Sequence, residues 1–173
     1  MNIIDAMKNR RSIRSFKPTM PEKADIDQII EAGLYAASGM NRQAPIIVAI
    51  TNKELRDKLS QQNAKIMGKE GSDPFYGAPA VLIVLADKNV PTHVYDGSLV
   101  MGNMMLAAYS LGLGSCWIHR AKEEFESEEG KALLKALGVE GDYEGIGHCV
   151  IGYIDGGEPA AKERKAGRVY WAE

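Results

Sequence analysis

A long apolar segment between Asp96 and Leu111 constrains the fold of this chain more than any other feature. Its apolar side chains are Leu99, Val100, Met104, Met105, Ala107 and Ala108. Their spacing predicts a helix, and the glycines at 112 and 114 are typical of a helix stop. Because this helix is apolar on nearly every side, we expect it to be central and too apolar for one small monomer to cover easily.

Other helices and strands are interspersed along the chain. Apolar residues at helical spacing, with capping and turn residues at the ends, predict helices at about 2–9, 23–37, 52–62 and 123–137. Short β-branched or apolar runs predict strands at 46–50, 81–86, 115–118 and 148–154. This order favours a mixed layer architecture of helices on a sheet, and it argues against a strict βαβ array because two helices precede the first strand.

Length and composition are those of one globular domain over residues 1–173, with 45 % hydrophobic and 25 % charged residues. The 21 basic and 23 acidic residues give a net charge of −2, which argues against nucleic acid or an anionic membrane as a partner. The longest apolar run, Ala78 to Ala86, is too short to span a bilayer. We see no secretory signal and expect a cytoplasmic protein with Cys116 and Cys149 as free thiols and no metal site.

The most informative polar cluster is Arg10-Arg11-Ser12-Ile13-Arg14, which follows the first helix. Guanidinium groups match phosphate oxygens bidentately, and the serine hydroxyl adds a neutral donor. A second basic cluster, Lys162 to Arg168, lies in a segment without periodicity. Each cluster alone is also typical of a solvated surface, and sequence spacing leaves open whether both meet at one phosphate.

Two further segments could contribute to a binding site. The loop from Ser38 to Gln43 carries side-chain amides that suit the edge of a heteroaromatic ring, although a plain turn explains it as well. The stretch from Gly112 to Ile118 lacks the lysine of a phosphate-binding P-loop. For Cys116 a buried structural thiol is favoured over a nucleophile, because no base stands at a known motif spacing.

Taken in order, these blocks resemble the FMN-dependent nitroreductase family. The blocks that carry the resemblance are Arg10–Phe16, Ala36–Gln43, Asp96–Ile118, His148–Tyr153 and the pair Lys162 and Arg164. They cover nearly the whole chain. The resemblance implies an α+β fold with a mostly antiparallel sheet flanked by helices, assembled as an intertwined homodimer that holds two FMN molecules at its interface.

The resemblance also implies the roles of individual residues. It places Arg10, Arg11, Ser12 and Arg14 on the FMN phosphate, ribityl chain and ring edge, and Lys162 and Arg164 on the phosphate. Ser38, Gly39 and Asn41 would reach the flavin from the other subunit, with Gln43 in the same loop. Trp117 and Ile118 would lie beside the isoalloxazine, with a backbone amide near N5, and Asn63 is the candidate for a ring-edge asparagine. The sequence departs from the common family pattern where Ala44 separates Gln43 from Pro45.

The function implied is that of an oxidoreductase, in which the flavin carries the redox chemistry and the protein supplies binding and electrostatics. NADH or NADPH would deliver hydride to flavin N5, and a small-molecule acceptor such as a nitroaromatic or a quinone would then take its place in a ping-pong cycle. Alternatives are an enone reductase or dehalogenase of the same family, and a non-catalytic protein that binds or stores flavin.

Overall fold

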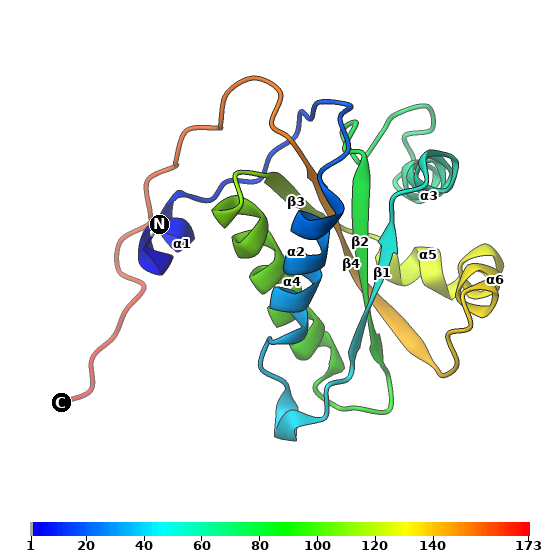
Figure 1. Ribbon diagram of the computed structural model, residues 1–173. Coiled ribbons are helices and arrows are strands. Elements are labelled where there is room, and N and C mark those ends of the chain that lie inside the picture. Colours follow the sequence, from blue (N-terminus) through cyan, green and yellow to red (C-terminus); the bar gives the residue numbers. More distant parts are fainter. Residues whose placement is uncertain (1) are drawn as a thin grey trace.

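The computed structural model describes residues 2–173 of the chain. Its elements are, in order, α1 (Ile3–Asn9), α2 (Lys23–Leu34), the short 3₁₀ helix η1 (Gly39–Asn41), β1 (Pro45–Ile50), α3 (Lys53–Ile66), β2 (Ala80–Asp87), α4 (His93–Ser110), β3 (Gly114–Ile118), α5 (Ala121–Glu126), α6 (Glu128–Ala136) and β4 (Tyr143–Gly152). Within the described chain no helix or strand follows β4, and an exposed tail runs from there to residue 173 (Figure 1).

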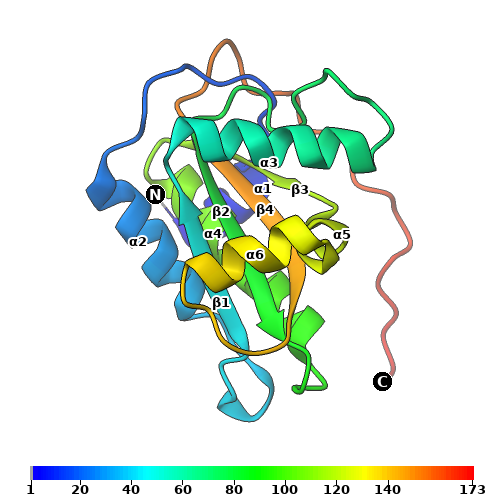
Figure 2. The same cartoon turned by 90° about the vertical axis from the view of Figure 1, so that its right-hand side faces the viewer.

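The four strands form one sheet in the order β1-β2-β4-β3, and all neighbouring strands are antiparallel. Helices α2 and α4 cover one face of this sheet, and α3, α5 and α6 cover the other (Figure 1). Figure 2 shows α3 and α6 lying across the second face. The expectation of a mostly antiparallel sheet flanked by helices is therefore confirmed.

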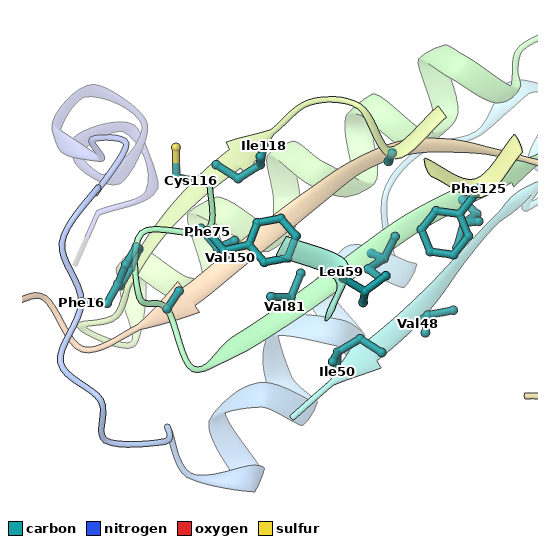
Figure 3. Packing of buried hydrophobic residues seen from close by; sticks show 14 of the residues in the cluster. Phe16, Val48, Ile50, Leu59, Phe75, Val81, Cys116, Ile118, Phe125 and Val150 are labelled. Carbon is teal, nitrogen blue, oxygen red and sulfur yellow. The ribbon is translucent and has the colours of Figure 1, made fainter. Parts of the chain in front are cut away.

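Each face of the sheet has its own hydrophobic core. The core under α3, α5 and α6 contains Leu59, Phe125 and the inward residues of the strands (Figure 3). The core under α2 and α4 contains Met101 and Met104, both fully buried. The apolar helix predicted from the sequence is thus buried on the face that packs against the sheet, but its other face is exposed at Tyr95 and Leu99, so the expectation of a central helix is met only in part. Among the described residues, no helix has both the length and the apolarity that crossing a membrane requires.

The prediction of one helix over 123–137 is wrong, because the chain breaks at Ser127 into α5 and α6. Ser127 has an extended backbone, and its hydroxyl accepts a hydrogen bond from the Gly130 amide as the cap of α6. Gly130 packs so tightly that an added Cβ would lie 2.2 Å from the Glu124 carbonyl oxygen. Charge and apolar spacing continue across the break, so periodicity does not reveal it.

The predicted strand 148–154 begins too late, since β4 already pairs with β2 from Tyr143 and ends at Gly152. The missed part contains Glu144 and two glycines, which have low strand propensity. One of them, Gly147, lies under the Trp117 indole, where an added Cβ would stand 2.4 Å from Nε1. Long-range packing therefore selects these residues. The helix predicted over 23–37 likewise ends earlier, at Leu34.

The two ends of the sheet carry different segments of the site. At one end Ser12 forms a bridge with Ser115 of β3, and the Ile13 amide donates to the Ser115 carbonyl. At the other end the loop before β1 closes on the end of β2, where the Asp87 amide donates to the Ala44 carbonyl. Strand β2 runs between these ends with eight residues, a span of roughly 25 Å.

Candidate functional site

A cavity of about 380 Å³ opens at the end of β3. One wall is the strand itself, from Cys116 to Ile118, followed by the turn at His119 and Arg120. The opposite wall is the loop between α3 and β2, which contributes Met67, Lys69, Ser72, Asp73, Pro74 and Tyr76. Arg14 stands at the cavity as well. The cavity therefore joins the end of β3 and its following turn to a loop that is distant in sequence.

The amino-terminal arginines differ in what their side chains do. The Nη1 atom of half-buried Arg10 is shielded from solvent and has no acceptor among the described residues. Arg14 is exposed and lines the cavity. Arg11 instead turns to the backbone and donates to the carbonyls of Lys8 (2.7 Å) and Arg10 (2.8 Å). A buried cationic donor without an acceptor is costly, so Arg10 fits an anionic ligand at this place.

Ser12 and Cys116 connect this cluster with β3. Burial raises the pKa of the Cys116 thiol, and Arg14, Ser12 and Arg10 oppose that rise. All three groups therefore lie close to the thiol. A raised pKa keeps the thiol protonated at neutral pH, which favours a structural role over a nucleophilic one. Cys149 is fully buried on β4, and burial raises its pKa to about 12.

Trp117 and Ile118 lie on β3 as expected and point to opposite faces of the sheet. Ile118 belongs to the core under α5, whereas half-buried Trp117 packs on the α4 side. The Trp117 Nε1 atom is buried without an acceptor among the described residues. Both residues line the cavity.

The turn after β3 has a strained backbone. Arg120 has φ +77°, a left-handed conformation that is uncommon for residues other than glycine. Its side chain donates through Nε to the Asn63 Oδ1 atom at 2.9 Å. Strained residues persist only where their surroundings hold them, and such residues gather at functional sites.

Asn63, the candidate for a ring-edge asparagine, lies behind the cavity rather than in its lining. It lies on α3 and is fully buried. Its amide donates to the His119 carbonyl at 2.8 Å, and its oxygen accepts from Arg120. Both ends of the amide are engaged inside the protein, and the expected contact of Asn63 with a cofactor stays a prediction.

Hydrogen bonds to Asp73 hold the loop between α3 and β2 in place. The Asp73 carboxylate accepts hydrogen bonds from Arg56, Ser60 and the amides of Phe75 and Gly77. Arg56 and Ser60 lower the pKa of this carboxyl against the opposing effect of burial. Sequence reasoning missed Arg56 and Asp73. The Asp73-Pro74 pair followed by Gly77 is a turn signal that could have drawn attention to the loop.

The loop with Ser38, Gly39, Asn41 and Gln43 lies at the other end of the sheet, away from this cavity. Asn41 and Gln43 both have positive φ, and the Gln43 amide donates to the Ser38 hydroxyl. The Gly39 amide donates to Asp96 at the start of α4 at 3.0 Å. Within one subunit, therefore, the structure does not bring this loop to the arginine cluster.

Lys162 and Arg164 lie in the exposed tail. Within residues 2–173, no hydrogen bond or ion pair joins them to the arginine cluster. Figures 1 and 2 show the tail leaving the sheet after β4 and ending away from it. Their expected contact with a phosphate stays a prediction. Across the same described residues, no three metal-ligating side chains come together.

The fold has three layers, α/β/α, with a cation-lined cavity at the end of the edge strand β3. A protein of this class can hold an anionic ligand against its sheet. The comparisons with known proteins narrow this class. The model of the nitroreductase family matches residues 7–153, so the chain belongs to the nitroreductase family. The family expected from the sequence is confirmed.

The relatives are distant but cover much of the chain. A nitroreductase of Bacteroides fragilis, solved with bound FMN, is 28 % identical, covers 100 % of both chains and has a TM-score of 0.90. A candidate NADH dehydrogenase/NAD(P)H nitroreductase of Methanothermobacter thermautotrophicus is 30 % identical over 68 % of this chain. An FMN reductase [NAD(P)H] of Bacillus subtilis is 28 % identical over 65 % of this chain. The matches span 60 % and 52 % of the lengths of these two relatives.

Proposed function

We propose that this protein is an FMN-dependent oxidoreductase that takes electrons from NADH or NADPH and passes them to a small-molecule acceptor. The observation that carries the proposal is the buried Nη1 atom of Arg10, a cationic donor without an acceptor among the described residues, whose charge acts on Cys116 in the cavity wall. The family membership and the FMN-bound relative support the same ligand. Nitroaromatics and quinones are the acceptors we expect in an assay.

The residues at the cavity fit a flavin mononucleotide. A phosphate monoester carries nearly two negative charges at neutral pH, so it can accept hydrogen bonds from both Arg10 and Arg14. Ser12 adds a neutral donor at the same place. The Arg11 guanidinium is already engaged with the backbone, so its contribution to the ligand should be smaller. When bound, FMN supplies the two-electron redox chemistry.

The remaining wall residues orient the ligand and exclude water. Strand β3 forms one wall of the cavity, and the loop held by Asp73 closes the opposite side. Buried Cys116 presents a neutral thiol beneath the cluster, so it places no competing negative charge next to a phosphate. These roles require no general acid or base from the protein.

The proposal includes a homodimer. The loop with Ser38, Gly39 and Asn41 lies at the opposite end of the sheet from Arg10, and only a second copy can bring it to the same flavin. Helix α4 exposes Tyr95 (73 %) and Leu99 (49 %), which suits an interface. Met101 and Met104, in contrast, are fully buried in the core of their own subunit and cannot contribute to an interface. Light scattering that finds a stable flavin-bound monomer would contradict the dimer.

The first experiment is spectroscopic. The purified protein should show a flavin absorbance spectrum, and heat should release FMN, identified by mass. Anaerobic addition of NADH or NADPH should bleach the spectrum, and a nitroaromatic or a quinone should restore it. Flavin that neither nucleotide reduces would instead support storage, and a protein that binds no flavin would defeat the proposal.

The second experiment uses neighbouring arginines as an internal comparison. Arg10→Ala should weaken FMN binding roughly tenfold to a hundredfold, the loss of one hydrogen bond to a charged group. Arg11→Ala should weaken FMN binding less, because the Arg11 guanidinium already donates a hydrogen bond to a backbone carbonyl. Riboflavin, which lacks the phosphate, should bind Arg10→Ala almost as well as it binds the parent.

The tail is tested in the same assay. If Lys162 and Arg164 close on the phosphate, Arg164→Ala weakens FMN binding and leaves riboflavin binding unchanged. Lys8→Ala and Lys135→Ala, on exposed helix positions, serve as controls. An Arg164→Ala protein that binds FMN as tightly as the parent shows that the tail is merely solvated.

A further inference from the structure

Three polar side chains with no part in the proposed contacts are completely buried behind the cavity: Asn63, Glu124 and His148. They come from α3, α5 and β4. The His148 Nε2 atom lies 2.9 Å from Glu124 Oε2, a close contact without hydrogen-bond alignment, and Asn63 Nδ2 lies 3.4 Å from the same oxygen. Burying such groups is costly, so the cluster calls for an explanation beyond packing.

The cluster contacts each residue of the strained turn in succession. His148 Nδ1 lies 3.4 Å from the Ile118 carbonyl oxygen. Asn63 donates to the His119 carbonyl at 2.8 Å and accepts from Arg120 Nε at 2.9 Å. The Arg120 carbonyl is held separately, by the backbone amide of Glu124 at 3.0 Å, in the first hydrogen bond of α5. The end of β3 and the left-handed Arg120 are thus held from behind at every step.

This arrangement determines where the backbone amide of Arg120 points. In a planar trans peptide, the C=O of one residue and the N–H of the next point in opposite directions. Because Asn63 holds the His119 carbonyl inward, the Arg120 N–H points away from the cluster. Among the described residues this amide has no acceptor. His119 and Arg120 line the cavity of the proposed site and also a neighbouring one.

We propose that Asn63, Glu124 and His148 are positioning residues, which hold the Ile118–Arg120 turn so that its free amide faces the ring of the bound flavin. The inference rests on the proposed function. A fixed donor at the ring stabilises negative charge on the reduced form and so raises the reduction potential of the flavin. Loosening the turn therefore makes the potential more negative and weakens binding of the cofactor.

The opposing explanation is that the cluster only stabilises the fold. Ser127→Ala provides a matched control, because Ser127 lies beside the same helix, donates to the Glu124 carbonyl and caps α6 without touching the turn. A purely structural role predicts that variants of Ser127 and Asn63 with equal losses of thermal stability have equal flavin properties.

The experiment compares Asn63→Leu, Glu124→Gln and Ser127→Ala as purified dimers or monomers, whichever the parent forms. The thermal midpoint of the apoprotein, the dissociation constant for FMN and the midpoint potential of the bound flavin are measured for each. We expect Asn63→Leu to bind FMN about tenfold more weakly, the loss of roughly one hydrogen-bonding contact, and to shift the potential to more negative values. Glu124→Gln, which keeps the shape of the side chain, should shift the potential less, and Ser127→Ala should not shift it.

A double-mutant cycle with Arg120→Ala tests the route of the effect. If Asn63 acts through this turn, the affinity lost in the double variant is smaller than the product of the two single losses. Parent-like affinity and potential in both Asn63→Leu and Glu124→Gln would overturn the inference while leaving the proposed function intact. If Asn63→Leu does not fold, Glu124→Gln alone decides by its potential. A parent that binds no FMN overturns both proposals.

Discussion

Two groups of polar residues connect α3 to neighbouring elements near the same cavity, and they differ in how completely their hydrogen-bonding atoms are paired. In the first, each Asp73 carboxylate oxygen accepts two hydrogen bonds, at distances between 2.6 and 3.0 Å. Arg56 also donates to the Ala78 carbonyl and stacks over the Phe75 ring. In the second, Glu124 Oε1 has no partner among the described residues.

The difference indicates distinct roles for two groups only one or two helical turns apart. A satisfied charged network in a partly exposed place adds stability, because every desolvated atom regains a partner. A fully buried network with an orphan acceptor adds little and persists for another reason, such as holding a strained turn. Stability measurements should therefore respond strongly to changes in the first group and weakly to a paired replacement in the second.

The largest effect is expected for Arg56→Met. The substitution removes the charged donor to the Asp73 carboxylate and the side-chain donor to the Ala78 carbonyl, while preserving much of the side-chain volume. We expect a loss of about 2–4 kcal/mol in the free energy of unfolding, below the range for fully buried pairs because Asp73 is 39 % exposed. Urea denaturation measures this loss. A loss below about 0.5 kcal/mol, the size expected for a surface ion pair, would show that the first group contributes no more to stability than a surface pair does.

Acid should weaken the first group next. Hydrogen bonds from Arg56 and Ser60 hold the pKa of Asp73 below its ordinary value of 3.8. A lowered native pKa means that stability is present above about pH 4 and is lost as the pH falls through the native value. Compared with Asp73→Asn, the parent should lose stability more steeply below pH 4. Parallel curves for the two proteins would show that Asp73 does not contribute.

A smaller change is expected when the buried pair is replaced as a whole. Glu124→Leu combined with His148→Phe keeps similar volumes and preserves aromatic contact with Phe75 and Phe125. Its unfolding free energy should lie within about 1 kcal/mol of the parent, since apolar replacement of a buried pair is often neutral or stabilising. Glu124→Leu alone should cost more, because it leaves His148 unpaired. A double variant that is much less stable than Glu124→Leu alone would show that the buried pair contributes strongly to stability.

The smallest effect belongs to the surface pair on the same helix. Lys53 contacts Asp57 with 86 % of its side chain exposed, so Lys53→Ala should change stability by less than about 0.5 kcal/mol. The same urea titration measures it and calibrates the scale for the two buried groups. A larger loss would mean that charge at the start of α3 contributes more than its exposure suggests.

Periodicity and composition by themselves determined much of this protein. Local rules predict the apolar stretch of α4, the continuous apolar runs of β1 and β2 and the capped start of α3. The spacing of apolar residues indicates which faces of an element are buried. The order of the motifs also identified the family, which the family match confirms. The arginine cluster next to β3 was a candidate anion site because guanidinium groups match phosphate oxygens, although its spacing is equally typical of a solvated surface.

Only the tertiary structure decided which polar groups meet. Sequence spacing treats Arg10 and Arg11 alike, yet one is left without an acceptor while the other bonds to its own backbone. Asn63 points inward because the turn after β3 passes behind it, and the loop at Ser38 lies a strand length away from the arginines. Hydrogen-bond partners depend on which distant segments the sheet brings together, and that information is spread over the whole chain rather than held in any local pattern.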